Sequence, residues 1–169
     1  MTTPATNEIL VSVLMGSSSD ADTMAAGRRA LRDLGIPHEA KVLSAHRTPG
    51  PLFEYIAGLE ARGCKIIIAG AGMAAHLAGV IAGHTSMPVL GVPLAAGQLQ
   101  GLDALLATVQ MPGGVPVGTF GIGKAGAKNA AFFAARILGL SDPAIRQRME
   151  DLLEENRKKI LSTTLPEEY

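Results

Sequence analysis

The sequence predicts a three-layer α/β/α sandwich built on a mainly parallel sheet, and two observations support this prediction. Short apolar runs bounded by glycine or proline alternate along the chain with longer segments whose apolar residues recur at helical spacing. The runs are almost continuously apolar, as is typical of strands that helices cover on both faces. This alternation favours right-handed crossovers between strands, and therefore a flavodoxin- or Rossmann-like sheet with helices on both sides.

The first strand is predicted over residues 9–15, which end before Gly16, and the first helix over residues 22–34, which Gly35 ends. The same alternation continues to residue 138. Further strands are predicted over residues 39–43, 65–69 and 88–92, with the VPVGT segment at 115–119 in the place of a fifth. Further helices are predicted over residues 51–61, 74–84, 99–109 and 124–138.

A last, extra helix is predicted over residues 142–161, because Asp142 is a good N-cap and Pro143 suits the first helical position. No strand follows this helix to place it on the sheet. Its apolar stripe therefore covers either its own domain or a neighbouring subunit, and the sequence leaves both open. The stripe comprises Ile145, Met149, Leu152, Leu153 and Ile160. Residues 1–8 are expected to form a flexible N-terminal tail, and residues 9–169 a single domain.

The composition favours a small-molecule partner. Fifteen basic residues balance fifteen acidic ones, so the sequence predicts no nucleic-acid-binding surface and no surface for an anionic membrane. Cys64 is the only cysteine, which excludes an intrachain disulfide and a thiolate zinc cluster and fits a reducing compartment. The first residues lack the pattern of a signal peptide, so a cytoplasmic localisation is expected.

Three segments that follow predicted strands are candidates for a ligand site, because ligands of open parallel sheets bind beyond the carboxyl ends of the strands. The first is MGSSSD at residues 15–20. Free backbone N–H groups at the helix start, together with Ser17, Ser18 and Ser19, would attract a phosphate. The Asp20 carboxylate would accept hydrogen bonds from a ribose diol. The segment therefore indicates a nucleotide, although an ordinary serine or aspartate N-cap would also explain it.

The second segment is SAHRTP at residues 44–49. His46 can donate or accept a proton near neutral pH, and Arg47 offers a planar fork for a phosphate. Adjacent side chains of an extended loop point in different directions, so His46 can face a base while Arg47 faces a phosphate. A loop histidine bonded to the backbone is the alternative.

The third segment is AGAGMAAHLAG at residues 69–79. Gly70 and Gly72 are expected to permit a tight turn and the close approach of a planar ligand. His76 is expected in the first turns of the following helix, facing the same rim as His46. A supporting role and a direct ligand contact both remain open for it.

The sequence predicts neither a metal nor a cofactor. Neither His46 nor His76 has a carboxylate or thiolate partner at ligand spacing, and no HExxH or CxxC pattern occurs. Residues 121–131 contain glycines but lack the spacing and the following acidic residue of the dinucleotide fingerprint, and no Gly-Lys-Ser/Thr occurs.

Several segments in the right order resemble the N5-carboxyaminoimidazole ribonucleotide mutase family of purine biosynthesis. They are MGSSSD, SAHRTP, AGAG-AAHLAG, PVLGVP, VQMP-GVPVGT and IGKAGAKNAA, and the resemblance runs from about residue 11 to 138. It implies an isomerase without cofactors that moves a carboxyl group from nitrogen to carbon 4 of an aminoimidazole ribonucleotide in IMP biosynthesis. It further implies that residues 9–169 form one catalytic domain, and a homo-octamer in which the last helix reaches a neighbouring subunit.

The resemblance also implies residue roles. The general acid–base would be His46, with His76 beside it, and His46 would protonate the departing nitrogen and recover a proton from carbon 4. Phosphate and ribose contacts would come from Gly16, Ser17, Ser19, Asp20, Ser44 and Arg47. The aminoimidazole and its carboxylate would lie near Ala45, Gly72, Met73, Ala74, His76 and Leu77.

Two positions depart from GAGGAAHLPG, the commonest form of the third segment in the family: Met73 replaces a glycine and Ala78 a proline. Both are expected near the base and the carboxylate, where Met73 either turns away or alters the pocket. A related branch that carboxylates aminoimidazole ribonucleotide directly with CO2 usually has lysine in place of Arg47 and lacks AAHL, so the sequence favours the mutase. The alternative from another class is a non-catalytic, flavodoxin-like nucleotide-binding module.

Overall fold

The computed structural model describes residues 9–165, so the expected tail at residues 1–8 lies outside the described part. One sheet of five parallel strands has the order β2-β1-β3-β4-β5. The strand order changes direction between β1 and β3, which makes this the switch point where doubly wound sheets bind ligands. The strands are β1 (Val11–Met15), β2 (His38–Val42), β3 (Ile66–Gly72), β4 (Val89–Leu94) and β5 (Gly118–Thr119).

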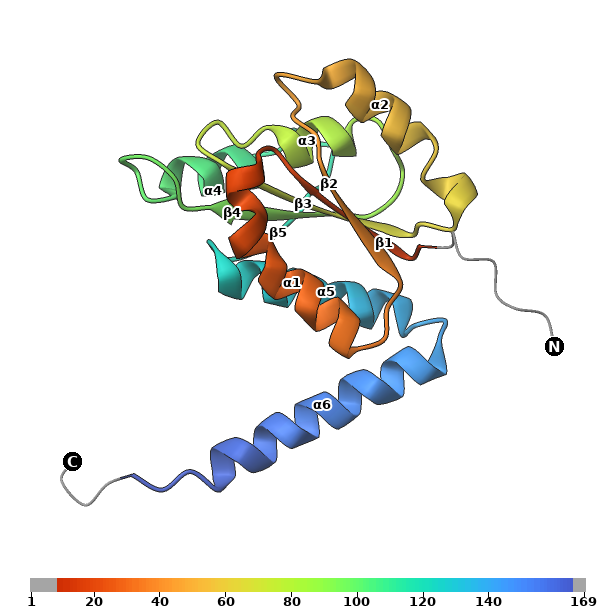
Figure 1. Ribbon diagram of the computed structural model, residues 1–169, viewed down its shortest axis with the longest axis vertical. Helices are drawn as coiled ribbons and strands as arrows, with labels where there is room; N and C mark the ends of the chain where they lie inside the picture. Colours follow the sequence, from red (N-terminus) through yellow and green to blue (C-terminus); the bar gives the residue numbers. More distant parts are fainter. Residues whose placement is uncertain (1–8, 166–169) are drawn as a thin grey trace.

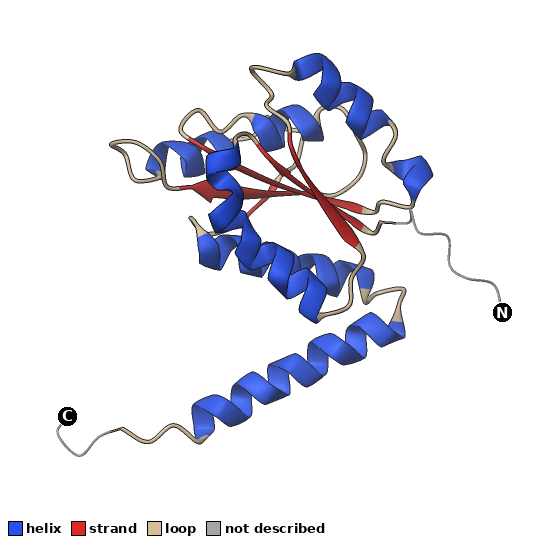
Figure 2. Cartoon of the chain, in the orientation of Figure 1, coloured by secondary structure: helices blue, strands red, loops and turns tan. Residues whose placement is uncertain are grey.

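Helices cover both faces of this sheet, which confirms the predicted three-layer sandwich (Figures 1 and 2). Helices α1 and α5 lie on one face, and α2, α3 and α4 on the other, while α6 lies outside the layers beyond α1 and α5. Their bounds are α1 (Ala21–Asp33), α2 (Pro49–Ala57), α3 (Leu77–Ala82), α4 (Leu102–Val109), α5 (Lys124–Leu138) and α6 (Pro143–Leu161). Two short 3-10 helices are η1 (Ser18–Asp20) and η2 (Glu60–Arg62). Among the described helices, none combines the length and hydrophobicity that a bilayer crossing requires.

The structure differs from the sequence prediction at the end of β3, and α2 ends at Ala57, four residues before its predicted end. This strand continues through Gly72, so Gly70 and Gly72 lie in the sheet rather than in the expected turn. A Cβ at Gly70 would overlap the Met24 sulfur, which explains the glycine there by close packing. The turn falls instead at Met73, and α3 begins three residues later than predicted.

The predicted fifth strand at the sheet edge is also shorter than expected. Pro116 has no N–H for the hydrogen-bond ladder, and β5 is only two residues long.

The layer formed by α1 and α5 is held together by small residues. A Cβ on Gly27 of α1 would lie 2.6 Å from the carbonyl oxygen of Ala127 in α5, so the two backbones are close. This approach lets α5 bury a row of alanines beneath the sheet. The row comprises Ala127, Ala130, Ala131, Ala134 and Ala135.

A polar network ties β1 and β2 to the α2 side of the sheet. The Tyr55 hydroxyl donates its one proton to Oε1 of Glu39 (2.5 Å). It therefore accepts in its hydrogen bond with the buried Ser12 hydroxyl (2.8 Å). Both carboxylate oxygens of Glu39 accept from the Arg62 guanidinium, at 2.6 and 2.8 Å. The hydrogen bonds from Arg62 hold the pKa of Glu39 below its usual value, and burial raises the pKa of Tyr55. We interpret this network as structural, because every member already has a partner.

Candidate active site

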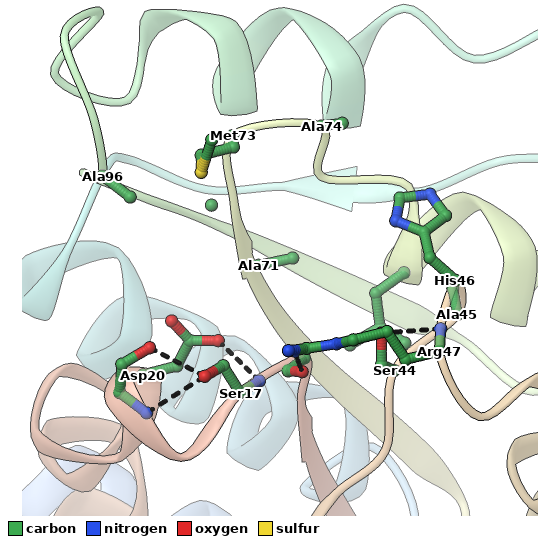
Figure 3. A pocket seen from close by; sticks show the side chains of 14 residues that line it. Ser17, Asp20, Ser44, Ala45, His46, Arg47, Ala71, Met73, Ala74 and Ala96 are labelled. Atoms are coloured by element: carbon green, nitrogen blue, oxygen red, sulfur yellow. Dashed lines mark hydrogen bonds between the residues drawn. The ribbon is translucent and has the colours of Figure 1, made fainter.

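A cavity of about 460 Å³ opens at the carboxyl edge of the sheet, between the loops that follow β1, β2, β3 and β4 (Figure 3). Its size suits a small organic ligand. It is lined by Gly16, Ser17, Ser19, Asp20, Ser44, Ala45, His46, Arg47, Ala71, Gly72, Met73, Ala74, Leu77 and Ala96.

This lining brings together His46 and the expected phosphate, ribose and base contacts except Ser18, which does not line the cavity. His76 lies beside the cavity, against His46. Two lining residues were missed. Ala71 was missed because β3 runs past its predicted end. Ala96 follows β4, and its only signal is that position at the carboxyl edge, since an alanine carries no chemical signature.

The β1 loop is folded on itself by a capping box. The Ser17 N–H donates to Oδ2 of Asp20 (3.0 Å), while both the N–H and the hydroxyl of Ser19 donate to Oγ of Ser17 (3.3 and 2.9 Å). The expectation of free backbone N–H groups is therefore wrong for Ser17 and Ser19, because η1 caps itself. Burial raises the pKa of Asp20 above its ordinary value of 3.8, and the Ser17 hydrogen bond and the Arg47 charge oppose this shift.

Arg47 joins the β1 and β2 loops, which are adjacent because these two strands pair. Its Nη2 donates to the Gly16 carbonyl (2.7 Å), and its Nε donates to Oγ of Ser44 (3.4 Å). Two of the five guanidinium N–H groups are thereby used. The other three have no partner within residues 9–165 and can serve an anion.

His46 and His76 form a hydrogen-bonded pair, with 2.9 Å between Nε2 of His46 and Nδ1 of His76. The rings meet edge to face at 88°. A hydrogen bond between two ring nitrogens contains one proton, so one imidazole donates and the other accepts. The structure places His76 against His46, but His76 precedes α3 instead of lying in its first turns. The pair can hold, orient and pass a proton.

The side of the cavity formed by β3 and β4 is apolar and consists mainly of alanines, with Met73 at the rim. Met73 has a left-handed backbone (φ 56°), and its side chain is exposed. Ala78 does not line the cavity. The sequence places it near a bound base, but α3 turns it into the core cluster with Leu52 and Ile81.

No three histidine, cysteine, aspartate or glutamate side chains converge as a metal site would require, within the residues that the structure describes. The groups available to a ligand at the cavity are therefore hydroxyls, one carboxylate, one guanidinium and the histidine pair. This set suits an anionic sugar at one end and proton transfer at the other.

The fold and the cavity define a class: a doubly wound α/β protein with a small-molecule site at its switch point. Within this class the chain belongs to the AIR carboxylase family, whose family model matches residues 10–159.

Relatives and solved structures agree with this membership. The chain is 48% identical to the N5-carboxyaminoimidazole ribonucleotide mutase of Bacillus subtilis, over 92% of this chain and 96% of the relative. It is 47% identical to the protein of that name from Escherichia coli K12, over 95% of each chain. The crystal structure of PurE from Treponema denticola is similar, with a TM-score of 0.82 and 29% identity over 91% of this chain and 95% of the other.

Proposed function

We propose that the chain is an N5-carboxyaminoimidazole ribonucleotide mutase, which forms 4-carboxyaminoimidazole ribonucleotide in IMP biosynthesis. The observation that carries this proposal is the pairing of His46 with His76 at one end of a cavity whose other end holds Arg47 and the serine loop. Relatives named for this reaction, at 47–48% identity over nearly the whole chain, support the same substrate.

The substrate would lie along the cavity from phosphate to base. Arg47 has guanidinium N–H groups available for the phosphate, next to the hydroxyls of Ser17 and Ser19. The Ser19 hydroxyl donates to Ser17 Oγ at an exposed position, and among the described residues Ser17 Oγ otherwise accepts only from the Ser19 N–H, so both hydroxyls can turn to an incoming anion. Asp20 would accept from the ribose diol. Gly16 and Ser44 complete this end, and the aminoimidazole would lie against Ala45, Gly72, Met73, Ala74 and Leu77.

The chemistry then requires one proton carrier. The C–N bond of the carbamate breaks with its electron pair left on nitrogen, which releases CO2, and His46 donates a proton to that nitrogen. Carbon 4 of the electron-rich imidazole attacks the retained CO2, and a C–C bond forms. Carbon 4 returns its proton to His46, so the enzyme ends the cycle as it began it. His76 would fix the orientation and tautomer of His46 through their hydrogen bond.

We propose further that residues 9–169 act as one catalytic domain and assemble as a homo-octamer in the cytoplasm, without a cofactor. The exposed second half of α6 supports contact with a neighbouring subunit, since Ile160 and Leu161 are 74% and 79% exposed in the single chain. The buried, unpaired thiol of Cys64 fits a reducing compartment.

The test of the reaction is direct. Purified protein receives N5-carboxyaminoimidazole ribonucleotide without ATP or bicarbonate, and the carbon-4 isomer is measured by chromatography and mass spectrometry. Product formation is expected, and its absence would contradict the mutase proposal. Product that forms only from aminoimidazole ribonucleotide and CO2 would identify the direct carboxylase instead. Binding without either reaction would favour the non-catalytic module.

The role of His46 is tested by His46→Asn. We expect this variant to bind the nucleotide but to lose about 10²–10⁴-fold in turnover, the range for a lost general acid–base. His84→Asn is the matched control, because His84 stacks on Phe53 outside the cavity and should not affect turnover. Turnover near the wild-type rate in His46→Asn would remove His46 from the proposed mechanism.

A further inference from the structure

Met73 has a backbone conformation that would suit glycine better. Its φ of 56° lies in the left-handed region, which is unfavourable for residues with a Cβ. Within residues 9–165 only one other non-glycine residue, Gln100, has a positive φ. Two short-range hydrogen bonds fix the turn, from the Ala75 N–H to the Met73 carbonyl and from the His76 N–H to the Ala74 carbonyl, both 2.8 Å. Glycine would form this turn without strain, so the methionine side chain itself needs an explanation.

The Met73 side chain is the one large, exposed apolar group at the cavity, among the lining residues that the structure describes. It is 59% exposed, while Leu77 is only 3% exposed and is fixed in the core. Figure 3 shows the thioether well away from His46, and the small Ala96 also lines the cavity. Methionine is unbranched and flexible, so it can adapt its shape to a ligand.

The proposed reaction has a step in which such a side chain would be useful. CO2 exists free between the two chemical steps, and it carries no charge and only weakly accepting oxygens, so the donors at the polar end hold it poorly. An apolar wall that excludes water can hold it beside carbon 4. The alanines at positions 45, 71, 74 and 96 supply a wall but are too short to cover a ligand from the open side.

We propose that the Met73 side chain folds over the aminoimidazole end of the bound nucleotide and retains CO2 between decarboxylation and recarboxylation. This inference rests on the proposed mutase reaction. Covering the ligand removes an exposed apolar side chain from water, which favours the closed arrangement. The tight turn fixes the Met73 backbone, so rotation about the side-chain bonds alone can bring the cover into place.

The test measures how much CO2 is lost from the cavity during turnover, here called leakage, instead of the rate of turnover. N5-carboxyaminoimidazole ribonucleotide is supplied to the wild type and to four variants, and the ratio of aminoimidazole ribonucleotide to carbon-4 isomer is determined after subtraction of enzyme-free decarboxylation. This ratio describes each turnover and does not depend on how much of the protein is folded. Met73→Ala removes the cover, Met73→Gln keeps its length but admits water, and Met73→Leu keeps an apolar side chain of similar volume.

We expect the leakage ratio to rise by about tenfold in Met73→Ala and Met73→Gln, because a few methylene-sized groups of apolar cover are lost. It should stay near the wild-type ratio in Met73→Leu. Met73→Gly should leak like Met73→Ala but melt at a higher temperature, since glycine relieves the backbone strain.

A leakage ratio equal to that of the wild type in both Met73→Ala and Met73→Gln would overturn the inference. It would not contradict the proposed mutase reaction. High leakage in Met73→Leu would also overturn the inference, because apolar cover would then not be the property that matters. A wild type that forms no carbon-4 isomer would contradict the proposed function itself, and the Met73 inference would fail with it.

Discussion

Single residues at the cavity already have partners in the free chain, and Asp20 shows this most clearly. Its carboxylate closes the capping box by accepting from the Ser17 N–H, and it is also the proposed ribose contact. Burial raises its pKa, so the folded chain disfavours the ionised form. Burial deprives the carboxylate of hydrogen bonds from water, and a ribose diol would replace them. The capping box alone could use a neutral side chain, so the proposed ribose contact gives a reason for a carboxylate at this position.

Asp20→Asn should therefore change how stability depends on pH. Because the pKa of Asp20 is higher in the folded chain than in the unfolded chain, the contribution of Asp20 to the free energy of unfolding falls as pH rises from 3.8 through the folded pKa, and stays lower above it. Asparagine does not ionise and still offers an oxygen to the Ser17 N–H. The free energy of unfolding of the variant should therefore increase relative to that of the wild type as pH rises. The increase should be less than about 1 kcal/mol, because the carboxyl group is only partly buried.

Urea unfolding of both proteins at several pH values from 3 to 7, about the range of carboxyl titration, measures this difference. The KM for the nucleotide should rise in the same variant, because the ribose contact is weakened. A stability difference that does not change with pH would contradict the desolvation of Asp20.

At the scale of secondary-structure elements, the backbones of α1 and α5 are in close contact, and Gly27 makes this contact possible. Gly27→Ala should destabilise the chain by about 1–3 kcal/mol, the usual penalty for overpacking, since its Cβ would meet the Ala127 carbonyl oxygen at 2.6 Å. Gly50→Ala in α2 is the matched control, because a Cβ there has no neighbour within 4 Å. It should leave stability unchanged or raise it by up to about 1 kcal/mol. Thermal and urea unfolding compare the two, and equal effects would contradict the close approach of α1 and α5.

Sequence reasoning located most elements and loops of this fold because the relevant signals are local. Buried strands are apolar runs, and the rule that ligands bind at the carboxyl ends selects the loops around Gly16, His46 and Met73. Helix α3 was predicted too early, because an alanine-rich segment favours helix while the turn at Met73 depends on packing. The hydrogen bond between His46 and His76 joins residues 30 positions apart, and only the placement of β2 and β3 on either side of β1 brings them together.

At the scale of the whole molecule, α6 is only partly held by its own chain. Ile145 and Met149 in its first half are buried, and Nε of Arg148 donates to the Leu34 carbonyl (2.6 Å). The second half of α6 extends past this anchorage (Figure 1) and exposes Ile160 and Leu161. The sequence left open whether the apolar stripe covers its own domain or a neighbour. The first half covers its own domain, and the second half is the part available to another copy of the chain.

The double variant Ile160→Asp, Leu161→Asp should therefore weaken assembly without unfolding the chain, since both side chains are exposed in the single chain. Native mass spectrometry and light scattering should give the mass of eight chains for the wild type and a smaller mass for the variant at equal concentration. The control Lys158→Gln, Lys159→Gln changes the net charge by the same amount at neighbouring exposed positions and should assemble like the wild type. A monomeric wild type would contradict the octamer. An unchanged mass in the aspartate variant would place the contact between subunits elsewhere than the end of α6.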